Sequence, residues 1–483
     1  MVNLRRSLVI NFMASSGATL VQFLVSVLLA RILSPSEIGI FSITIVFVNI
    51  AHIFRDFGVA TYLQREPELT PEKTRAAIGV LFTSSWLIAI LLYLSSGWIA
   101  AWFKEPAIVP TMEVLALGFL FIPFGAVTHA LLTRQFAAEK QAIVTVAGTL
   151  SYSATCLGLA ALGFGTMSLA WANLVNIIVC GLAYIPLRPK GTPWLPSFRN
   201  WGSVVNFGIG TLLTNCAQAV NNAIPDVLLG KLGSAKHVGL FSRANSTVTI
   251  FTYVAGSTVN YGALSYISQA HHRGESLAPL LSRATALLTG VGWPVLTLTA
   301  LLGKDIVLVL YGPNWLECVP AIFPLAAAAA FMMAFHYVPT ALTALGRPYL
   351  AAFPLTLSVL TRIAFGVWLF DGTLHSFAWT VFLATLATMP VMVVQQKKYL
   401  GVPMRQMLRA QLPSALVSTA VALAAEFLMM LLPASIPAIV RLFSMSLPLI
   451  VVWYLTLRMT RHELLPEVHH LTTGLKMRLM RQC

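Results

Sequence analysis

The chain has 483 residues, of which 57% are hydrophobic and only 10% are charged, with a mean hydropathy of +0.80 and a formal net charge of +15. Soluble domains carry roughly 25% charged residues, so this composition excludes a soluble globular protein and predicts an integral membrane protein. The excess of basic residues follows the topology described next, and gives no reason to expect nucleic acid as a partner.

Apolar segments of about 20 residues, the length needed to cross the hydrocarbon core, recur along the whole chain. The first follows Arg5 and Arg6, is too long for a secretion signal, and is interpreted as a retained helix. We predict an all-α polytopic protein with fourteen membrane-spanning helices, at residues 8–30, 38–62, 76–101, 108–132, 141–163, 166–187, 203–230, 238–267, 282–302, 319–345, 349–370, 375–396, 411–432 and 438–457.

The basic residues between these segments are distributed unequally over the two sides of the membrane. One side carries Arg31, Lys104, Lys231, Lys236, Lys304 and Arg441, whereas most of the 31 lysines and arginines lie on the other. By the positive-inside rule the richer side is cytoplasmic, so both termini are predicted to be cytoplasmic. Residues 459–483 then form a basic cytoplasmic tail.

One pattern occurs twice, as LLARILSPSEIGIFS at 28–42 and LLGKLGSAKHVGLFS at 228–242. The first copy joins the first two predicted spans and the second joins the seventh and eighth, so the repeat unit is six helices in one orientation. We predict two six-helix lobes, 1–190 and 191–400, with two further helices in 401–458. Tandem lobes are typical of transporters, and packing alone is the alternative reason for a repeat.

Several ordered motifs carry a resemblance to a known family. They are ARILSPSEIGIFSI after the first span, FRDFGVATYLQRE at 54–66, VGLFSRANSTVTIF at 238–251, LYGPNWLECVPAIFPLA at 310–326 and ALGRP at 344–348. Together they resemble the polysaccharide transporter family, the O-antigen and exopolysaccharide flippases of the multidrug/oligosaccharidyl-lipid/polysaccharide exporter superfamily.

This resemblance implies a multi-pass protein of the bacterial inner membrane. Such a protein moves undecaprenyl-diphosphate-linked oligosaccharide from the cytoplasmic to the periplasmic leaflet during lipopolysaccharide or exopolysaccharide biosynthesis. The implied partners are this lipid-linked oligosaccharide, membrane lipids, and the polysaccharide polymerase and export proteins.

A diphosphate must cross about 30 Å of hydrocarbon, which requires a water-lined cleft with cationic groups. Three arginines fall within predicted spans: Arg55, Arg243 and Arg362. A guanidinium group can bind phosphate oxygens through two parallel hydrogen bonds. We predict that they bind the diphosphate; arginines on the second and eighth helices line the cavity of related lipid II flippases, as the resemblance implies. The alternatives are a snorkelling or locally paired Arg55 beside Asp56, a loop-closing Arg243, and a structurally paired Arg362.

The span at 203–230 is the most polar. Its Asn215, Gln218 and Asn222 share one helical face, where amides can bind sugar hydroxyls or join neighbouring helices. Asp56 and Asp226 are candidate ion-coupling residues for Na⁺ or H⁺, with a local pair to Lys231 as the alternative for Asp226.

The chain contains no hydrolase motif, nucleotide-binding loop or metal-ligand spacing, so we expect no enzymatic activity, cofactor or metal. The working hypothesis is alternating access, in which the two lobes open a cationic cleft to each side in turn. One alternative is a drug or cation exporter of the same superfamily, which would favour an acidic cavity. The other is a non-transporting scaffold of a polysaccharide synthesis complex.

Overall fold

The structure is a computed structural model that describes residues 4–66, 68–199, 201–260, 267, 269, 273–433 and 435–468, and all regular elements in these ranges are helices. The chain divides into two compact units, Met1–Gly239 and Leu240–Cys483. This division falls inside a helix instead of at the predicted lobe boundary between residues 190 and 191. The predicted lobes therefore stay a prediction.

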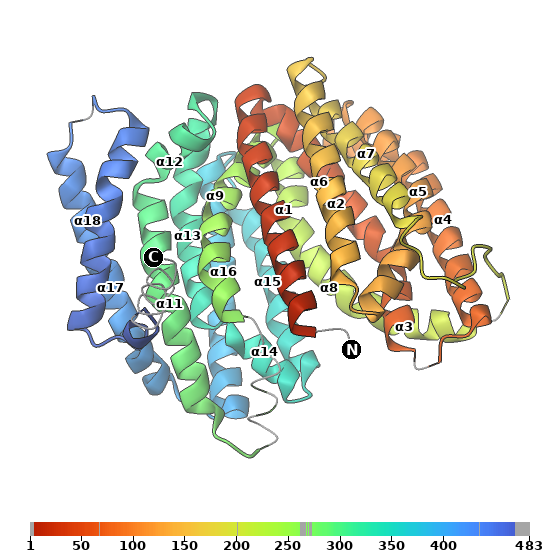
Figure 1. The fold of residues 1–483 in the computed structure, drawn as a ribbon. Helices are drawn as coiled ribbons and strands as arrows, with labels where there is room; N and C mark the ends of the chain where they lie inside the picture. Colours follow the sequence, from red (N-terminus) through yellow and green to blue (C-terminus); the bar gives the residue numbers. More distant parts are fainter. Residues whose placement is uncertain are drawn as a thin grey trace, which may run out of the picture. The chain divides into compact units, whose positions relative to one another are not determined.

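The first unit is built on α2, which packs against α4, α5, α7 and α8 (Figure 1). Long helices pair in the series α4–α5, α5–α7, α7–α6 and α6–α1, so each apolar helix has a neighbour on which to bury a face. The helices of this unit are α1 (Leu4–Ile32), α2 (Pro35–Asp56), α3 (Val59–Arg65), α4 (Pro71–Phe103), α5 (Ile108–Arg134), α6 (Ala138–Ala161), α7 (Thr166–Tyr184) and α8 (Gly202–Leu232).

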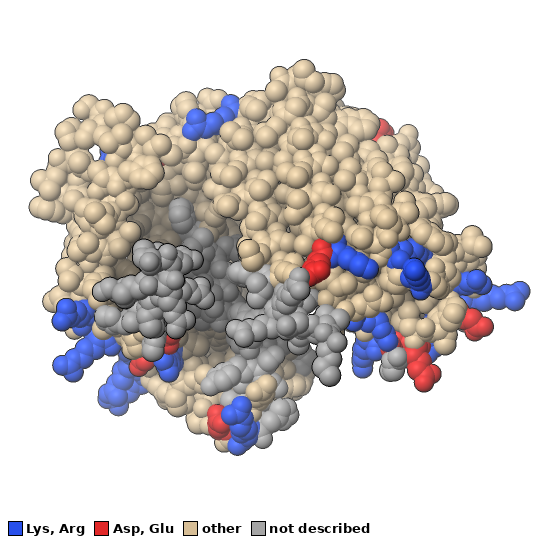
Figure 2. Space-filling model, in the orientation of Figure 1, with Lys and Arg blue, Asp and Glu red and all other residues tan. Residues whose placement is uncertain are grey.

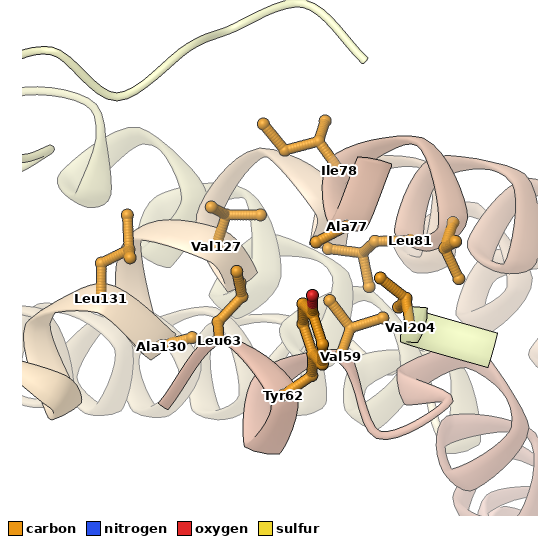
Figure 3. Packing of buried hydrophobic residues seen from close by; sticks show 11 residues of the cluster. Val59, Tyr62, Leu63, Ala77, Ile78, Leu81, Val127, Ala130, Leu131 and Val204 are labelled. Carbon is orange, nitrogen blue, oxygen red and sulfur yellow. The ribbon is translucent and has the colours of Figure 1, made fainter. Parts of the chain in front are cut away.

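Short α3 has a buried cluster around it. Its Val59, Tyr62 and Leu63 pack against residues of α4 and α5 and against Val204 at the start of α8 (Figure 3). The cluster fixes the position of the segment that follows α2, because each of these side chains is at most 4% exposed.

The second unit contains most of α9 and all later elements. Here α11 packs against α13 and α17, α16 packs against α13 and α15, and α18 lies beside α17 (Figure 1). The elements are α9 (Ala235–Asn260), α11 (Leu277–Leu301), α12 (Gly303–Leu310), the 3₁₀ helix η1 (Pro313–Cys318), α13 (Val319–Ala334), α14 (Tyr337–Ala344), α15 (Pro348–Leu369), α16 (Leu374–Leu400), α17 (Met404–Leu431) and α18 (Ala438–Met459).

The surface of the helices is that of a membrane protein. Large apolar side chains are exposed, among them Leu94 at 71% and Trp368 at 84%, while on the face drawn in Figure 2 the lysines and arginines lie mainly at helix ends. Twelve segments of the described residues are long and apolar enough to cross a membrane. The predicted all-helical multi-pass fold is confirmed. The count of fourteen stays a prediction, because α8 and α9 coincide with predicted spans but are not among those twelve segments.

The two copies of the repeated stretch begin two helices in the same way. Ser34 precedes α2, and its hydroxyl accepts a hydrogen bond from the Glu37 backbone N–H at 3.3 Å. In turn, the Ser34 backbone N–H donates to the Glu37 carboxylate at 2.7 Å. Ser234 precedes α9, and its hydroxyl accepts from the His237 N–H at 3.4 Å. A side-chain acceptor at this position satisfies an N–H that the helix leaves unpaired.

The same two stretches also pack against each other. A Cβ added to Gly39 would overlap the backbone carbonyl of Ala235, and one added to Gly239 would overlap the carbonyl of Pro35. Both contacts are with backbone, which cannot rotate away as a side chain can. The repeated glycines therefore permit a close crossing of the first turns of α2 and α9.

The predicted span 38–62 is not one helix. Phe57 and Gly58 have positive φ angles of 44° and 69°, so α2 ends at Asp56 and α3 begins at Val59. Glycine adopts this left-handed conformation readily, and Gly208 of α8 supplies the space, since a Cβ there would overlap the Phe57 ring and carbonyl. The prediction of a continuous helix was wrong because the apolar run continues across the break.

Candidate functional site

A pocket of about 450 Å³ lies between α2 and α8 within the first unit. Its apolar wall comes mainly from α2, and four polar side chains converge on it: Asn49 from α2 and Gln218, Asn222 and Asp226 from α8. Polar residues inside membrane helices are costly in lipid and by default face a cavity or a partner. This group is therefore the candidate site, and we call it the amide pocket.

The polar wall follows directly from helix periodicity. Gln218, Asn222 and Asp226 are spaced by four residues and so lie above one another on one face of α8. The Gln218 amide donates a hydrogen bond of 3.2 Å to the Asn222 carbonyl oxygen. Asn215 lies in α8 as well, but its side chain lies outside the described residues.

Asp226 is the acidic residue in the described lining of the pocket. It forms no ion pair or side-chain hydrogen bond with any residue that the structure describes. The alternative partner Lys231 points elsewhere: its amino group donates to the Trp102 carbonyl at 2.9 Å and lies 5.1 Å from the centre of the Trp102 ring. The carboxylate therefore remains available to a cation or a donor in the pocket.

Asn49 was not predicted as a site residue. The available signal was the single amide of the predicted span 38–62, and that signal cannot say which neighbouring helix the amide will face. Packing of α2 on α8 brings it to Gln218 and Asn222.

Arg55 and Asp56 lie in the last turn of α2 and are not part of the described lining of the amide pocket. The Arg55 guanidinium is 3.4 Å from Nδ1 of His52 and 4.0 Å from the Asp56 carboxylate, and its backbone carbonyl accepts from the Ser84 hydroxyl at 2.7 Å. His52 in turn stacks on Phe119 of α5 at 4.6 Å between ring centres. Part of the Arg55 charge is thus balanced within the helix end.

Arg243 lies on α9 in the second unit and is only 9% exposed. Its guanidinium lies 5.6 Å from the centre of the Tyr311 ring and 5.7 Å from that of the Trp315 ring. The Thr247 hydroxyl donates a hydrogen bond to the Arg243 backbone carbonyl at 2.8 Å, and it lies 3.4 Å from the Tyr311 hydroxyl. Two of the motifs that carry the family resemblance therefore meet in one buried cation–π cluster.

Sequence reasoning named Arg243 but not its aromatic neighbours. Tyr311 and Trp315 are 2% and 0% exposed, and the turn between them contains Gly312 with φ of 93° followed by Pro313. The turn folds the two rings toward each other at 6.3 Å. The signal was the aromatic pair in LYGPNW, which local pattern alone does not connect to an arginine far along the chain.

Arg362 lies in the middle of α15 and is partly buried, and α15 packs against α14 and α16. It belongs to the second unit together with Arg243, whereas Arg55 and the amide pocket belong to the first. Among the predicted site residues, the described pocket brings together Gln218, Asn222 and Asp226.

A set of membrane-length helices with polar side chains gathered in a pocket between them defines a polytopic membrane protein of the transporter type. The chain belongs to the polysaccharide biosynthesis protein family, which matches it over residues 28–320. The family resemblance inferred from the motifs is confirmed.

Among curated relatives, the teichuronic acid biosynthesis protein TuaB of Bacillus subtilis (strain 168) is 22% identical over 342 residues, which are 69% of each chain. Among solved structures, the lipid II flippase MurJ in an inward closed conformation matches with a TM-score of 0.74 and 13% identity, covering 93% of this chain and 99% of MurJ. A multidrug resistance MATE family transporter of the MOP superfamily gives a TM-score of 0.57 and 14% identity over 82% of this chain and 94% of its own. At these identities the structural matches show a shared fold.

Proposed function

We propose that the protein is a flippase that moves polyprenyl-diphosphate-linked oligosaccharide from the cytoplasmic to the periplasmic leaflet of the bacterial inner membrane by alternating access. Both termini lie in the cytoplasm in this proposal. The family membership and the fold shared with a lipid II flippase support it.

The observation that carries the proposal is the amide pocket. Amide side chains both donate and accept hydrogen bonds, as sugar hydroxyls do, and three of them line the pocket: Asn49, Gln218 and Asn222. Its volume of about 450 Å³ is that of an ordinary small-ligand site and suits part of an oligosaccharide. We assign sugar binding to these side chains and, with them, to Asn215.

The charged candidates take separate roles in the proposal. Arg243 and Arg362 supply positive charge for the diphosphate, and Arg55 contributes less because Asp56 shares its charge. Asp226, with Asp56 as the second candidate, binds the coupling ion, Na⁺ or H⁺. Polysaccharide polymerase and export proteins are the proposed downstream partners.

A second candidate function has a specific observation in its favour. Within the described lining of the amide pocket, the ionisable residue is the acidic Asp226, which suits a cationic drug in an exporter of the MATE type. A third candidate function is a scaffold of a polysaccharide synthesis complex, which transports no substrate.

The test is reconstitution of the full-length protein in liposomes with a fluorescent polyprenyl-diphosphate-linked oligosaccharide, combined with mass spectrometry of lipids from depleted cells. We expect lipid-linked sugar to accumulate on depletion. We also expect transbilayer movement to fall about tenfold in Asn222→Ala, but not in the control Asn314→Ala, an exposed amide on η1. If polysaccharide export continues in depleted cells and no lipid-linked sugar accumulates, the flippase proposal is overturned. If the protein in liposomes transports an organic cation instead, the exporter is favoured.

A further inference from the structure

The outer face of α11 and α17 holds a second hollow, within the second unit and distinct from the amide pocket. It has a volume of about 550 Å³ and is lined by Trp293 of α11 and by one face of α17. The two helices run side by side (Figure 1). We call it the α11–α17 groove.

One end of this groove is cationic. Arg405 and Arg409 lie one turn apart on α17 and line the groove, and both are exposed. Neither forms an ion pair or hydrogen bond with any residue that the structure describes, and the first turn of α17 contains no acidic residue. Within the described part of the chain, the two guanidinium groups thus have no counter-charge.

The remainder of the groove is apolar. Leu408 and Leu412 are 55% and 58% exposed along it, and Ala415 continues the same wall. Two of its polar groups already have partners: the Trp293 indole donates to the Ala330 carbonyl at 2.9 Å, and the Gln411 amide donates to the Ala334 carbonyl at 3.2 Å. An apolar chain is therefore the occupant that this part can stabilise.

The length of the groove suits one leaflet. Ten residues of helix separate Arg405 from Ala415, which corresponds to about 15 Å at 1.5 Å per residue. The hydrocarbon core is about 30 Å thick, so the length of the groove corresponds to about one leaflet.

We propose that the α11–α17 groove binds an anionic phospholipid. The phosphate lies between Arg405 and Arg409, each of which can donate two parallel hydrogen bonds to its oxygens. One acyl chain lies against Trp293 and along the apolar wall of α17, formed by Leu408, Leu412 and Ala415. The inference requires only that the protein is embedded in a bilayer, and it does not depend on the flippase proposal.

The experiment is native mass spectrometry of the purified full-length protein titrated with phosphatidylglycerol or phosphatidylcholine of the same chain length. We expect phosphatidylglycerol to bind more tightly by at least tenfold, and Arg405→Gln with Arg409→Gln to abolish that preference. Arg458→Gln with Arg461→Gln is the control, because it removes the same charge from exposed positions outside the groove. Ala415→Trp, which keeps both arginines and fills the apolar part, should also weaken phosphatidylglycerol about tenfold.

Four outcomes would overturn the inference. The first three are equal affinity for the two lipids, equal losses in the groove and control variants, and displacement of the lipid by inorganic phosphate at the same concentration, which would reveal an anion site without a chain site. Preferential displacement by undecaprenyl phosphate would also overturn it, because the groove would then hold substrate. Melting temperatures without added lipid check that each variant is folded.

Discussion

Arg243 shows which interactions stabilise a buried positive charge. A guanidinium that is removed from water loses the favourable interaction with its hydration shell. The faces of the Tyr311 and Trp315 rings replace part of that interaction. A desolvated cation–π contact is worth about 2 kcal/mol. Arg243 therefore contributes to the stability of the fold, in addition to the role in diphosphate binding that we propose for it.

Replacing Arg243 separates these two contributions. We expect Arg243→Ala to lower the free energy of unfolding by about 2–4 kcal/mol, because it removes the ring contacts and leaves a cavity beside Tyr311 and Trp315. Arg243→Lys keeps the cation but not the planar stacking, so about half of the loss should remain. Denaturation in detergent measures this, with transport normalised to folded protein. An unchanged melting temperature with lost transport would instead assign Arg243 to substrate binding alone.

His462, just after α18, is a buried residue with a defined protonation state. Its Nδ1 accepts from the Leu464 backbone N–H at 3.0 Å, so Nε2 carries the proton and donates to the Ser414 hydroxyl at 2.9 Å. Ser414 lies 2.9 Å from the Thr289 hydroxyl, which continues the chain of hydrogen bonds into α11. Burial lowers the pKa of His462 below its ordinary value of 6.5.

This histidine predicts a loss of stability in acid. As the pH falls below about 6.5 the unfolded chain takes up a proton before the folded one does, so the folded state is progressively disfavoured. We expect the melting temperature in detergent to fall between pH 7 and pH 5, and to fall less in His462→Gln, which cannot titrate. Parallel pH profiles for the two proteins would contradict the assignment.

At the scale of the helices, hydropathy located the elements well, because a bilayer demands about 20 apolar residues whatever the neighbours are. The break after α2 escaped prediction, since it depends on the left-handed pair Phe57–Gly58 and on the room left by Gly208 in another helix. In the site, Gln218 and Asn222 were predictable from spacing on one helix. Asn49 was not, because the pairing of α2 with α8 is a tertiary fact.

Two glycines provide a matched test of helix packing. Gly39 meets backbone across the α2–α9 crossing, whereas an added Cβ at Gly97 of α4 would meet nothing within 4 Å. We expect Gly39→Ala to lower the melting temperature by several degrees or more, because the two helices must move apart. Gly97→Ala should be neutral or stabilise the helix by up to about 1 kcal/mol. Equal effects of the two substitutions would show that the crossing is not tight in solution.

For the whole molecule, the distribution of basic residues makes a prediction about sidedness. In a background without reactive cysteines, Ser36→Cys and Lys236→Cys should react with an impermeant thiol reagent added to intact spheroplasts. Glu72→Cys and Gly191→Cys should react only after the membrane is opened. All four positions are exposed, so access to the reagent depends on side and not on burial. Labelling of position 72 from outside would invert the topology.

The crossing of the repeated stretches has a consequence for substitutions. Where two copies of a pattern do not touch, a substitution in one copy disturbs only that copy. Here the space that Gly39 leaves is filled by the backbone of the second copy, and the space that Gly239 leaves is filled by the first. A side chain added at either glycine would therefore press on the backbone of the other copy, so the two glycines form one packing unit although they lie 200 positions apart.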